Sequence, residues 1–309
     1  MTAVQQVPVG APTGPIRRRR AARRVPPLVW AFLLLPLTVE LFWVFWPAMN
    51  SFSLSFTDWS GVGAAQPVGF ENYERLLADP IFATALRNNV IWAIGFGGLS
   101  VVGGLVLAVA LNRPGRGVGI YRSAIYLPMV ISLAVTGLFW RVMYQPGGPI
   151  DTGLGAIGLG ALQQQWLANP DTALYAVLIA AVWRQVGYIM VLYLAGLKGC
   201  DPTLEEAAAV DGANAWQRFW RVVMPQLRGV NTVVFAVTVI DSLRTFDIVW
   251  AMTRGGPYNT TQLLSTYMFQ QGFTLVNLGY GSALAVVIFL LAIAFIITYL
   301  VRQARAEEG

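Results

Sequence analysis

Six long apolar stretches constrain the fold of this 309-residue chain more than any other feature of its sequence. About 20 residues of α-helix cross the hydrocarbon core of a bilayer. A water-soluble protein in which 56% of the residues are hydrophobic and only 12% are charged could not bury that much apolar surface. The sequence therefore predicts an all-α polytopic membrane protein with six transmembrane helices, at about 28–50, 89–111, 120–144, 173–197, 230–252 and 278–301.

The basic residues predict how these helices are oriented. The segment 1–27 is polar, and it is strongly basic from Arg17 to Arg24, so we expect a disordered tail. The apolar stretch after it is too long for a signal peptide and lacks a small-residue cleavage site, which predicts a retained first span. The tail, the turn at 112–122, the loop at 198–228 and the C-terminus hold six, three, four and two of the 21 basic residues. Because cytoplasmic segments collect Lys and Arg, both termini are predicted to be cytoplasmic, and the net charge of +6 needs no nucleic-acid partner.

The composition also excludes several kinds of chemistry. The chain has no histidine and a single cysteine, so it has no disulfide framework and no cysteine-based metal cluster. We expect no metal and no cofactor of its own. The Gly-x-x-x-x-Gly-Lys-Ser/Thr loop that holds nucleotide phosphates is missing, so the chain is not expected to hydrolyse ATP.

Three loops between the spans are too long for simple turns. The outer loop 51–88 contains a polar helical stretch, Glu71–Leu86, and the outer loop 145–172 is rich in glycine. The inner loop 198–229 is the most informative. Its residues 204–210 are strong helix formers, and Gly212 can adopt the positive φ that ends a helix.

A second short helix is predicted in the inner loop from Ala215 to Val223, closed by Pro225. It carries apolar residues at helical spacing, namely Trp216, Phe219, Trp220 and Val223. A helix–turn–helix with an apolar stripe, between two spans on the cytoplasmic side, has a shape that suits a groove on a partner protein.

This loop resembles the EAA loop of ABC-type importer permeases. The matching residues are Glu206-Ala207-Ala208, then Asp211-Gly212-Ala213, then Val222-x-Met224-Pro225 in place of the usual Ile-x-Leu-Pro. The resemblance implies the type I permease fold over 28–305, with 203–228 as the coupling loop seated in a cleft of the ATP-binding subunit. The coupling residues that it implies are Glu206, Ala207, Ala208, Asp211, Gly212, Trp216 and Pro225.

A second motif is similar to the outer loop of carbohydrate-importer permeases of the maltose and glycerol-phosphate type. It runs from Thr253 through Gly255-Gly256-Pro257 and continues with Thr260, Leu263, Tyr267 and Phe273. This resemblance implies a multi-pass protein of the bacterial inner membrane that pairs with a second, homologous permease. It also implies two cytoplasmic ATP-binding subunits, a periplasmic or extracellular solute-binding protein, and a sugar-like solute.

Ionisable groups inside spans are costly and by default face a cavity or a partner. Asp241, Arg244 and Thr245 are spaced to lie on one face of the fifth span, either as a hydroxyl-binding surface or as a structural ion pair. The resemblance places substrate contacts in the fourth and fifth spans, and together these considerations give a predicted substrate path of Gln185, Tyr188, Thr238, Asp241, Ser242, Arg244 and Thr245. Arg184 beside them would suit an anionic head group. Glu40 in the first span has no assigned role.

The leading hypothesis is a permease subunit that moves an oligosaccharide by alternating access while separate subunits hydrolyse ATP. The same machinery importing a glycerophosphodiester or a polyol is the first alternative. A secondary transporter or channel working alone is a second, but no internal symmetry or proton relay supports it. An intramembrane enzyme that uses paired aspartates is a third, weakened by the missing histidine.

Overall fold

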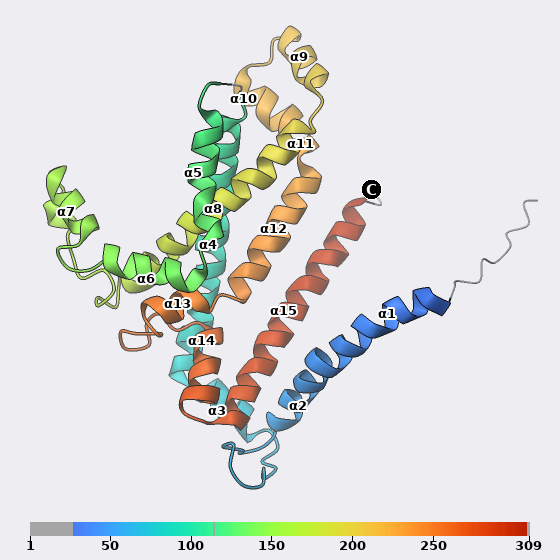
Figure 1. The fold of residues 1–309 in the computed structure, drawn as a ribbon, viewed down its shortest axis with the longest axis vertical. Helices are drawn as coiled ribbons and strands as arrows, with labels where there is room; N and C mark the ends of the chain where they lie inside the picture. The colour runs from blue at the N-terminus through green and yellow to red at the C-terminus, as the bar shows by residue number, and fades with distance from the viewer. Residues whose placement is uncertain (1–26, 114, 308–309) are drawn as a thin grey trace, which may run out of the picture. The chain divides into compact units, whose positions relative to one another are not determined.

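The computed structural model describes residues 27–113 and 115–307. These residues form helices joined by loops, with one isolated antiparallel bridge between Thr57 and Pro67 (Figure 1). The chain divides into two compact units, Met1–Ala48 and Met49–Gly309. The predicted disordered tail, residues 1–27, lies outside the described residues except for Pro27, which begins the first helix.

The first unit contains the predicted first span. Helix α1 runs from Pro27 to Glu40 and passes through one wider π-type turn, η1 (Leu41–Phe45), into α2 (Trp46–Leu54), which continues past the unit boundary. Residues 32–54 are long and apolar enough to cross a membrane. Glu40 lies at the junction between α1 and the π-type turn.

The second unit is built around α4 (Pro80–Leu111) and α8 (Ala173–Lys198), which pack closely along their length. Glycines of α4 permit this approach: a Cβ atom on Gly104 would lie only 2.6 Å from the side chain of Ile189. Trp92 of α4 is fully buried in a hydrophobic cluster with residues of α8. Ile189 of α8 is fully buried in a second hydrophobic cluster, which includes residues of α4. The predicted fourth span is thus confirmed.

The second span begins earlier than predicted, and the predicted helical stretch 71–86 is divided at Asp79 between two helices. Helix α3 runs only from Glu71 to Ala78, and α4 starts at Pro80. Asp79 separates them because its side chain accepts a hydrogen bond from the backbone N–H of Ile81 (2.8 Å) and so caps α4. Proline fits the first turn of a helix, where its missing N–H costs nothing.

The third span is broken, which contradicts the continuous helix predicted over 120–144. Helix α5 (Val118–Val130) and α6 (Leu133–Met143) meet at an angle of 104° (Figure 1). Pro128 removes one backbone donor near the end of α5, and the side chain of Ser132 caps α6. The glycine-rich outer loop that follows contains a short helix, α7 (Pro149–Ala156), and a 3₁₀ turn, η2 (Gly160–Leu162).

The fifth span also differs from the prediction of 230–252. Helix α12 extends from Arg228 to Leu243 and stops, and the next residues form a separate helix, α13 (Asp247–Met252). Thr245 lies in the break, where its hydroxyl oxygen accepts a hydrogen bond from the indole N–H of Trp92 (3.0 Å). The helix therefore ends beside α4, with the side chain of Thr245 held between Trp92 and the carbonyl of Asp241.

The remaining helices lie in the inner loop and at the C-terminal end. The inner loop contains α9 (Pro202–Val210), α10 (Ala215–Arg218), the π-type turn η3 (Phe219–Val223) and α11 (Met224–Gln226). After α13 come α14 (Leu264–Phe269), the π-type turn η4 (Gln270–Thr274) and the sixth span α15 (Leu278–Glu307). Four helices of the described residues are long and apolar enough to cross a membrane, and two bent pairs raise that number to six. The multi-pass helical fold predicted from the sequence is confirmed.

Candidate functional site

The inner loop turns at Gly212, as the sequence predicts. This residue has φ = +83°, and no atom lies within 4 Å of the position that a Cβ would occupy. Its N–H donates to the carbonyl of Ala209 (3.1 Å), and the N–H of Ala213 donates to the carbonyl of Ala208 (3.0 Å). These two bonds are the pattern that satisfies the last carbonyls of a helix when a left-handed residue follows it.

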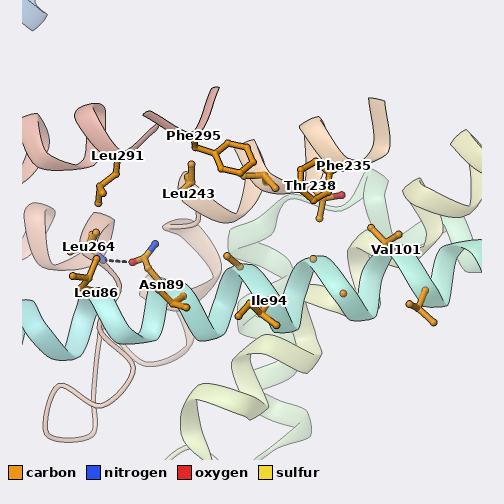
Figure 2. A pocket seen from close by; sticks show the side chains of 16 residues that line it. Leu86, Asn89, Ile94, Val101, Phe235, Thr238, Leu243, Leu264, Leu291 and Phe295 are labelled. Carbon is orange, nitrogen blue, oxygen red and sulfur yellow. Dashed lines mark hydrogen bonds between the residues drawn. The ribbon is translucent and has the colours of Figure 1, made fainter. Parts of the chain in front are cut away.

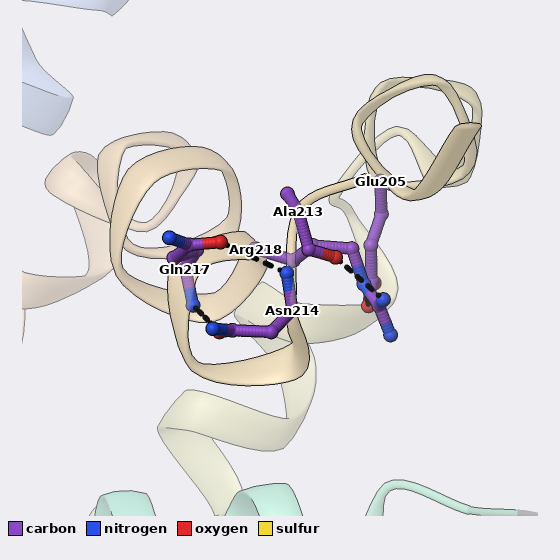
Figure 3. A network of polar contacts seen from close by, with 5 residues as sticks. All are labelled: Glu205, Ala213, Asn214, Gln217 and Arg218. Carbon is purple, nitrogen blue, oxygen red and sulfur yellow. Dashed lines mark hydrogen bonds and ion pairs between the residues drawn. The ribbon is translucent and has the colours of Figure 1, made fainter. Parts of the chain in front are cut away.

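Polar side chains fix the second half of the turn (Figure 3). Asn214 and Gln217 form a reciprocal capping box at the start of α10, with both bonds at 2.9 Å. Arg218 donates to the carbonyl of Ala213 (3.2 Å) and lies 3.6 Å from the carboxylate of Glu205, the one ion pair among the described residues. The pair joins α9 to α10 across the turn, so the loop has a defined shape before any partner binds.

A hydrogen bond also holds together the two ends of the loop. The backbone N–H of Asp201 donates to the side-chain oxygen of Gln226 (2.8 Å), which brings the start of α9 to the end of α11. Asp201 in turn caps α9, and hydrogen bonds from the hydroxyl and the N–H of Thr203 hold the pKa of its carboxyl below the ordinary value. The loop is closed at both its tip and its base.

The predicted apolar stripe of the loop divides into two faces. Val223 is buried, and Phe219 packs against the hydrophobic cluster that contains Ile189. On the other face, Trp216 is 71% exposed and Trp220 is 44% exposed. Glu206 and Ala207 are also exposed on α9. Pro225 does not close the second helix as predicted, because it lies in the first turn of α11, where its missing N–H is tolerated, and the helical backbone continues to Gln226.

The outer motif around Gly255 also has a specific shape. Gly255 has φ = +86°, and a Cβ there would lie 2.3 Å from the side chain of Gln262. The segment is anchored to the outer end of α4, since the amide of Asn88 donates to the carbonyls of Thr260 (2.8 Å) and Gln262 (2.9 Å). At the tip, Tyr258 is 88% exposed.

The predicted substrate path lies where α8 and α12 meet. Gln185, which is almost fully buried, donates a hydrogen bond to the carboxylate of Asp241 (2.9 Å). Tyr188 lies one turn further along α8 and is partly buried. The hydroxyls of Thr238 and Ser242 are 1% exposed and donate to carbonyls of their own helix. In this arrangement Gln185 and Asp241 form the polar centre of the path, while the two hydroxyls are internally satisfied.

Two of the charged groups in this region have contacts that the sequence left open. Of the two alternatives for Asp241 and Arg244, the ion pair is not formed among the described residues, and Arg244 lies directly after the last residue of α12. The guanidinium of Arg184, which by its charge would suit an anionic head group, donates to the carbonyls of Ile131 (3.1 Å) and Met129 (3.2 Å) at the break of the third span.

An apolar groove of about 580 Å³ runs along α4, between α12, α14 and α15 (Figure 2). Thr238, a residue of the predicted path, lines it, but its hydroxyl is bonded to Val234. Asn89, the other polar residue of the lining, accepts a hydrogen bond from the N–H of Leu264 (2.8 Å). The groove therefore offers a hydrocarbon wall rather than polar contacts.

The sequence did not predict a polar cluster that joins the start of α4 to α14 and α15. The carboxylate of Asp79 accepts hydrogen bonds from the hydroxyls of Tyr267 and of Tyr280 (2.7 Å). Burial on its own would raise the pKa of Asp79, but the two hydroxyls and the backbone N–H of Ile81 outweigh it and hold that pKa below its ordinary value. The cluster joins α4, α14 and α15. The Asp-Pro step was its one local signal, and the tyrosines lie 188 and 201 residues away.

The comparison with known families decides the class of protein. A sequence profile of the family described as "binding-protein-dependent transport system inner membrane component" matches residues 100–305. The chain belongs to this family. It is the permease component of an ABC importer, an inner-membrane protein whose ATPase is a separate subunit.

Relatives of the permease cover nearly its whole length. A probable ABC transporter permease of Pyrococcus horikoshii is 35% identical over 93% of this chain and 99% of its own. The α-glucoside transport system permease protein of Rhizobium meliloti is 32% identical over 95% of this chain and 86% of its own. Among solved structures, a bacterial ABC transporter involved in importing the acidic polysaccharide alginate has a similar fold, with a TM-score of 0.77 over 90% of this chain and 95% of that one, at 21% identity.

Proposed function

We propose that residues 28–305 of the permease form one half of a path for a carbohydrate, and that ATP-binding subunits drive it through the loop 203–228. The observation that carries the proposal is the shape of that loop. A left-handed glycine, a capping box and an ion pair hold α9 against α10, while Trp216 is 71% exposed at its surface. Exposed tryptophans on a rigid support are typical of the residues that dominate protein–protein interfaces.

The loop needs a partner of defined chemistry. Glu206, Ala207 and Asp211 are exposed on α9 and after it, and the aromatic pair Trp216 and Trp220 is exposed on the helical run that follows. Such a surface fits a cleft that combines an apolar floor with a polar rim. In the proposed assembly two cytoplasmic ATP-binding subunits supply these clefts, one for this permease and one for a second, homologous permease. Both termini are then cytoplasmic, and a solute-binding protein delivers solute from outside.

The proposed mechanism of transport depends on the connection between the loop and α12. The helical run 215–226 meets α12 at an angle of 74°, with the buried Leu227 at the corner. Force applied to the loop therefore reaches α12, and α12 carries Asp241, which is bonded to Gln185 of α8. Closure of the ATPases would rock these helices together and change which side of the membrane the path faces. The chemistry of ATP hydrolysis stays in the partner.

The proposal of a carbohydrate rests on polar groups and on relatives. An amide and a carboxylate, Gln185 and Asp241, can accept and donate hydrogen bonds to sugar hydroxyls, and Tyr188 lies beside them. Thr238, Ser242 and Thr245 complete the proposed path in α12 and just after it. The α-glucoside transport permease resembles this chain along nearly its full length. The outer motif Gly255-Gly256-Pro257 is proposed as the face that meets the solute-binding protein.

Co-purification and uptake together test the proposal. A tagged permease should recover a second permease and an ATP-binding subunit from native membranes, and cells should take up a labelled oligosaccharide in an ATP-dependent way. Glu206→Lys should abolish recovery of the ATP-binding subunit, while Glu74→Lys, an exposed charge reversal on α3, should leave it unchanged. Recovery of the permease alone, with ATP-independent transport, would contradict the assignment.

A further inference from the structure

The break between α5 and α6 leaves backbone groups that the membrane cannot satisfy. The carbonyls of Met129 and Ile131 accept no backbone hydrogen bond from the described residues, because the chain turns by 104° between α5 and α6. Ser132 caps only the N–H groups of α6. In hydrocarbon no water is available for the carbonyls, so a broken span needs polar groups from a neighbouring helix.

Arg184 of α8 supplies these groups. Its Nε donates to the carbonyl of Ile131 (3.1 Å), and one terminal nitrogen donates to the carbonyl of Met129 (3.2 Å). One turn further along α8, a Cβ on Gly187 would lie 2.2 Å from the carbonyl oxygen of Ile125. The face of α8 that carries Arg184 and Gly187 is thus pressed against the last two turns of α5.

Beyond the break, α6 is packed on α13. A Cβ on Gly137 would lie 2.7 Å from the Cβ of Ala251 and 3.4 Å from the carbonyl oxygen of Ile248. Arg141 of α6 is also within 3.5 Å of the carbonyl of Ala251. Helix α13 itself follows the break after α12. Two short helices, each after a break in its span, therefore form one packed pair.

We propose that Arg184 is a positioning residue for transport, which makes the α6–α13 pair move as one body with α8. A broken span can bend at its break, and bending there would absorb the movement that arrives from the inner loop. A planar guanidinium that binds the carbonyl of Met129 in the last turn of α5 and the carbonyl of Ile131 in the break fixes the break against α8 and so resists that bending. The inference rests on the proposed ATP-driven rocking of the spans, and it gives Arg184 a mechanical role in place of solute binding.

Pulsed EPR distances within the purified complex test this role. Nitroxides at Val142 of α6 and Val191 of α8, both exposed, report on the angle across the break. A reference pair at Ile94 of α4 and Tyr121 of α5 reports on helices that the break does not separate. With the single native cysteine replaced by serine, the parent should give a narrow distribution for both pairs, unchanged by ATP with vanadate. Arg184→Gln should lose the narrow distribution of the first pair only.

Two variants separate positioning from general damage. Ile179→Ala alters an exposed residue of the same helix and leaves both bonds of Arg184 in place, so the first pair should stay narrow. Arg184→Lys keeps the charge but can reach only one carbonyl and not bridge two, so it should give an intermediate width.

Three results would overturn the proposal. They are a parent-like width in both Arg184 variants, equal broadening in Ile179→Ala, and broadening of the reference pair as well. A raised KM for uptake in Arg184→Gln with an unchanged width would assign Arg184 to solute binding instead. The width in the absence of nucleotide does not depend on the ATPase, so the recovery experiment on Glu206→Lys tests the coupling loop separately.

Discussion

Replacing Gly212 by alanine tests the shape of the inner loop with little interference from packing. Nothing lies within 4 Å of the new methyl group, so its effect comes from the backbone alone. Holding a non-glycine residue in the left-handed region costs about 1–2 kcal/mol, and 1.4 kcal/mol is a factor of about 10 in an equilibrium constant. Since α9 is short and exposed, the loop can relieve this strain by leaving its docking shape.

The expected result is a weaker hold on the ATP-binding subunit. If only a fraction of the loops keeps the docking shape, the apparent affinity falls by that fraction, so alanine should lower it by about 5–30-fold. The assay is quantitative recovery of the ATP-binding subunit with tagged permease over a series of dilutions. Gly229→Ala is the matched control, because Gly229 lies within helix α12 and also has nothing within 4 Å of its Cβ position.

Asparagine at the same position gives a second check, because its side chain tolerates the left-handed region better than alanine does. Gly212→Asn should therefore recover most of the lost affinity. Equal recovery of the ATP-binding subunit by the Gly212→Ala and Gly229→Ala proteins would refute the argument that the left-handed turn shapes the docking surface.

Three further predictions concern the spans and the outer face. Gln185→Leu leaves the Asp241 carboxylate without its partner and should lower the stability of the purified complex by about 1–3 kcal/mol, seen as a lower midpoint of thermal unfolding. Asp79 has a lowered pKa in the folded protein, so its contribution to stability is complete above the unfolded value near 3.8 and is lost as the pH falls through the folded value. Tyr280→Phe should reduce this acid-dependent loss, and an unfolding midpoint with the parent's slope against pH below 4 would contradict that. Gly255→Ala combines a positive φ with a 2.3 Å clash, so we expect poor recovery of folded protein, and a normal yield by size-exclusion chromatography would show that the outer loop can rearrange.

Local patterns predicted the features whose cause is local. The left-handed turn at Gly212 and helix α9 before it depend on residues within a few positions of each other, and both are confirmed. The predicted fourth span, 173–197, matches α8 to within one residue at its end. The apolar run in the sequence and the helix begin and end at nearly the same positions. The family motif of the loop likewise lies within one continuous segment, and the comparisons confirm the family.

Continuous apolar runs misled the prediction wherever a span is broken. The stretches 120–144 and 230–252 contain enough apolar residues to cross a membrane, yet each contains a break. Hydropathy measures whether a segment can lie in lipid, and it carries no information on whether the backbone stays helical. The residues that permit the breaks, such as Pro128 and Ser132, act only because another helix satisfies the freed carbonyls.

The sequence by itself determined that this chain crosses a membrane several times, that one of its loops turns at Gly212, and which family it belongs to. Only the tertiary structure decided what the polar groups of the spans do. Arg184 contacts carbonyls 53 and 55 residues earlier in the chain, and Gln185 contacts a carboxylate 56 residues later. In a medium without water each buried polar group must find a partner wherever the fold brings one close, and that choice is made by the packing of helices and not by neighbouring residues.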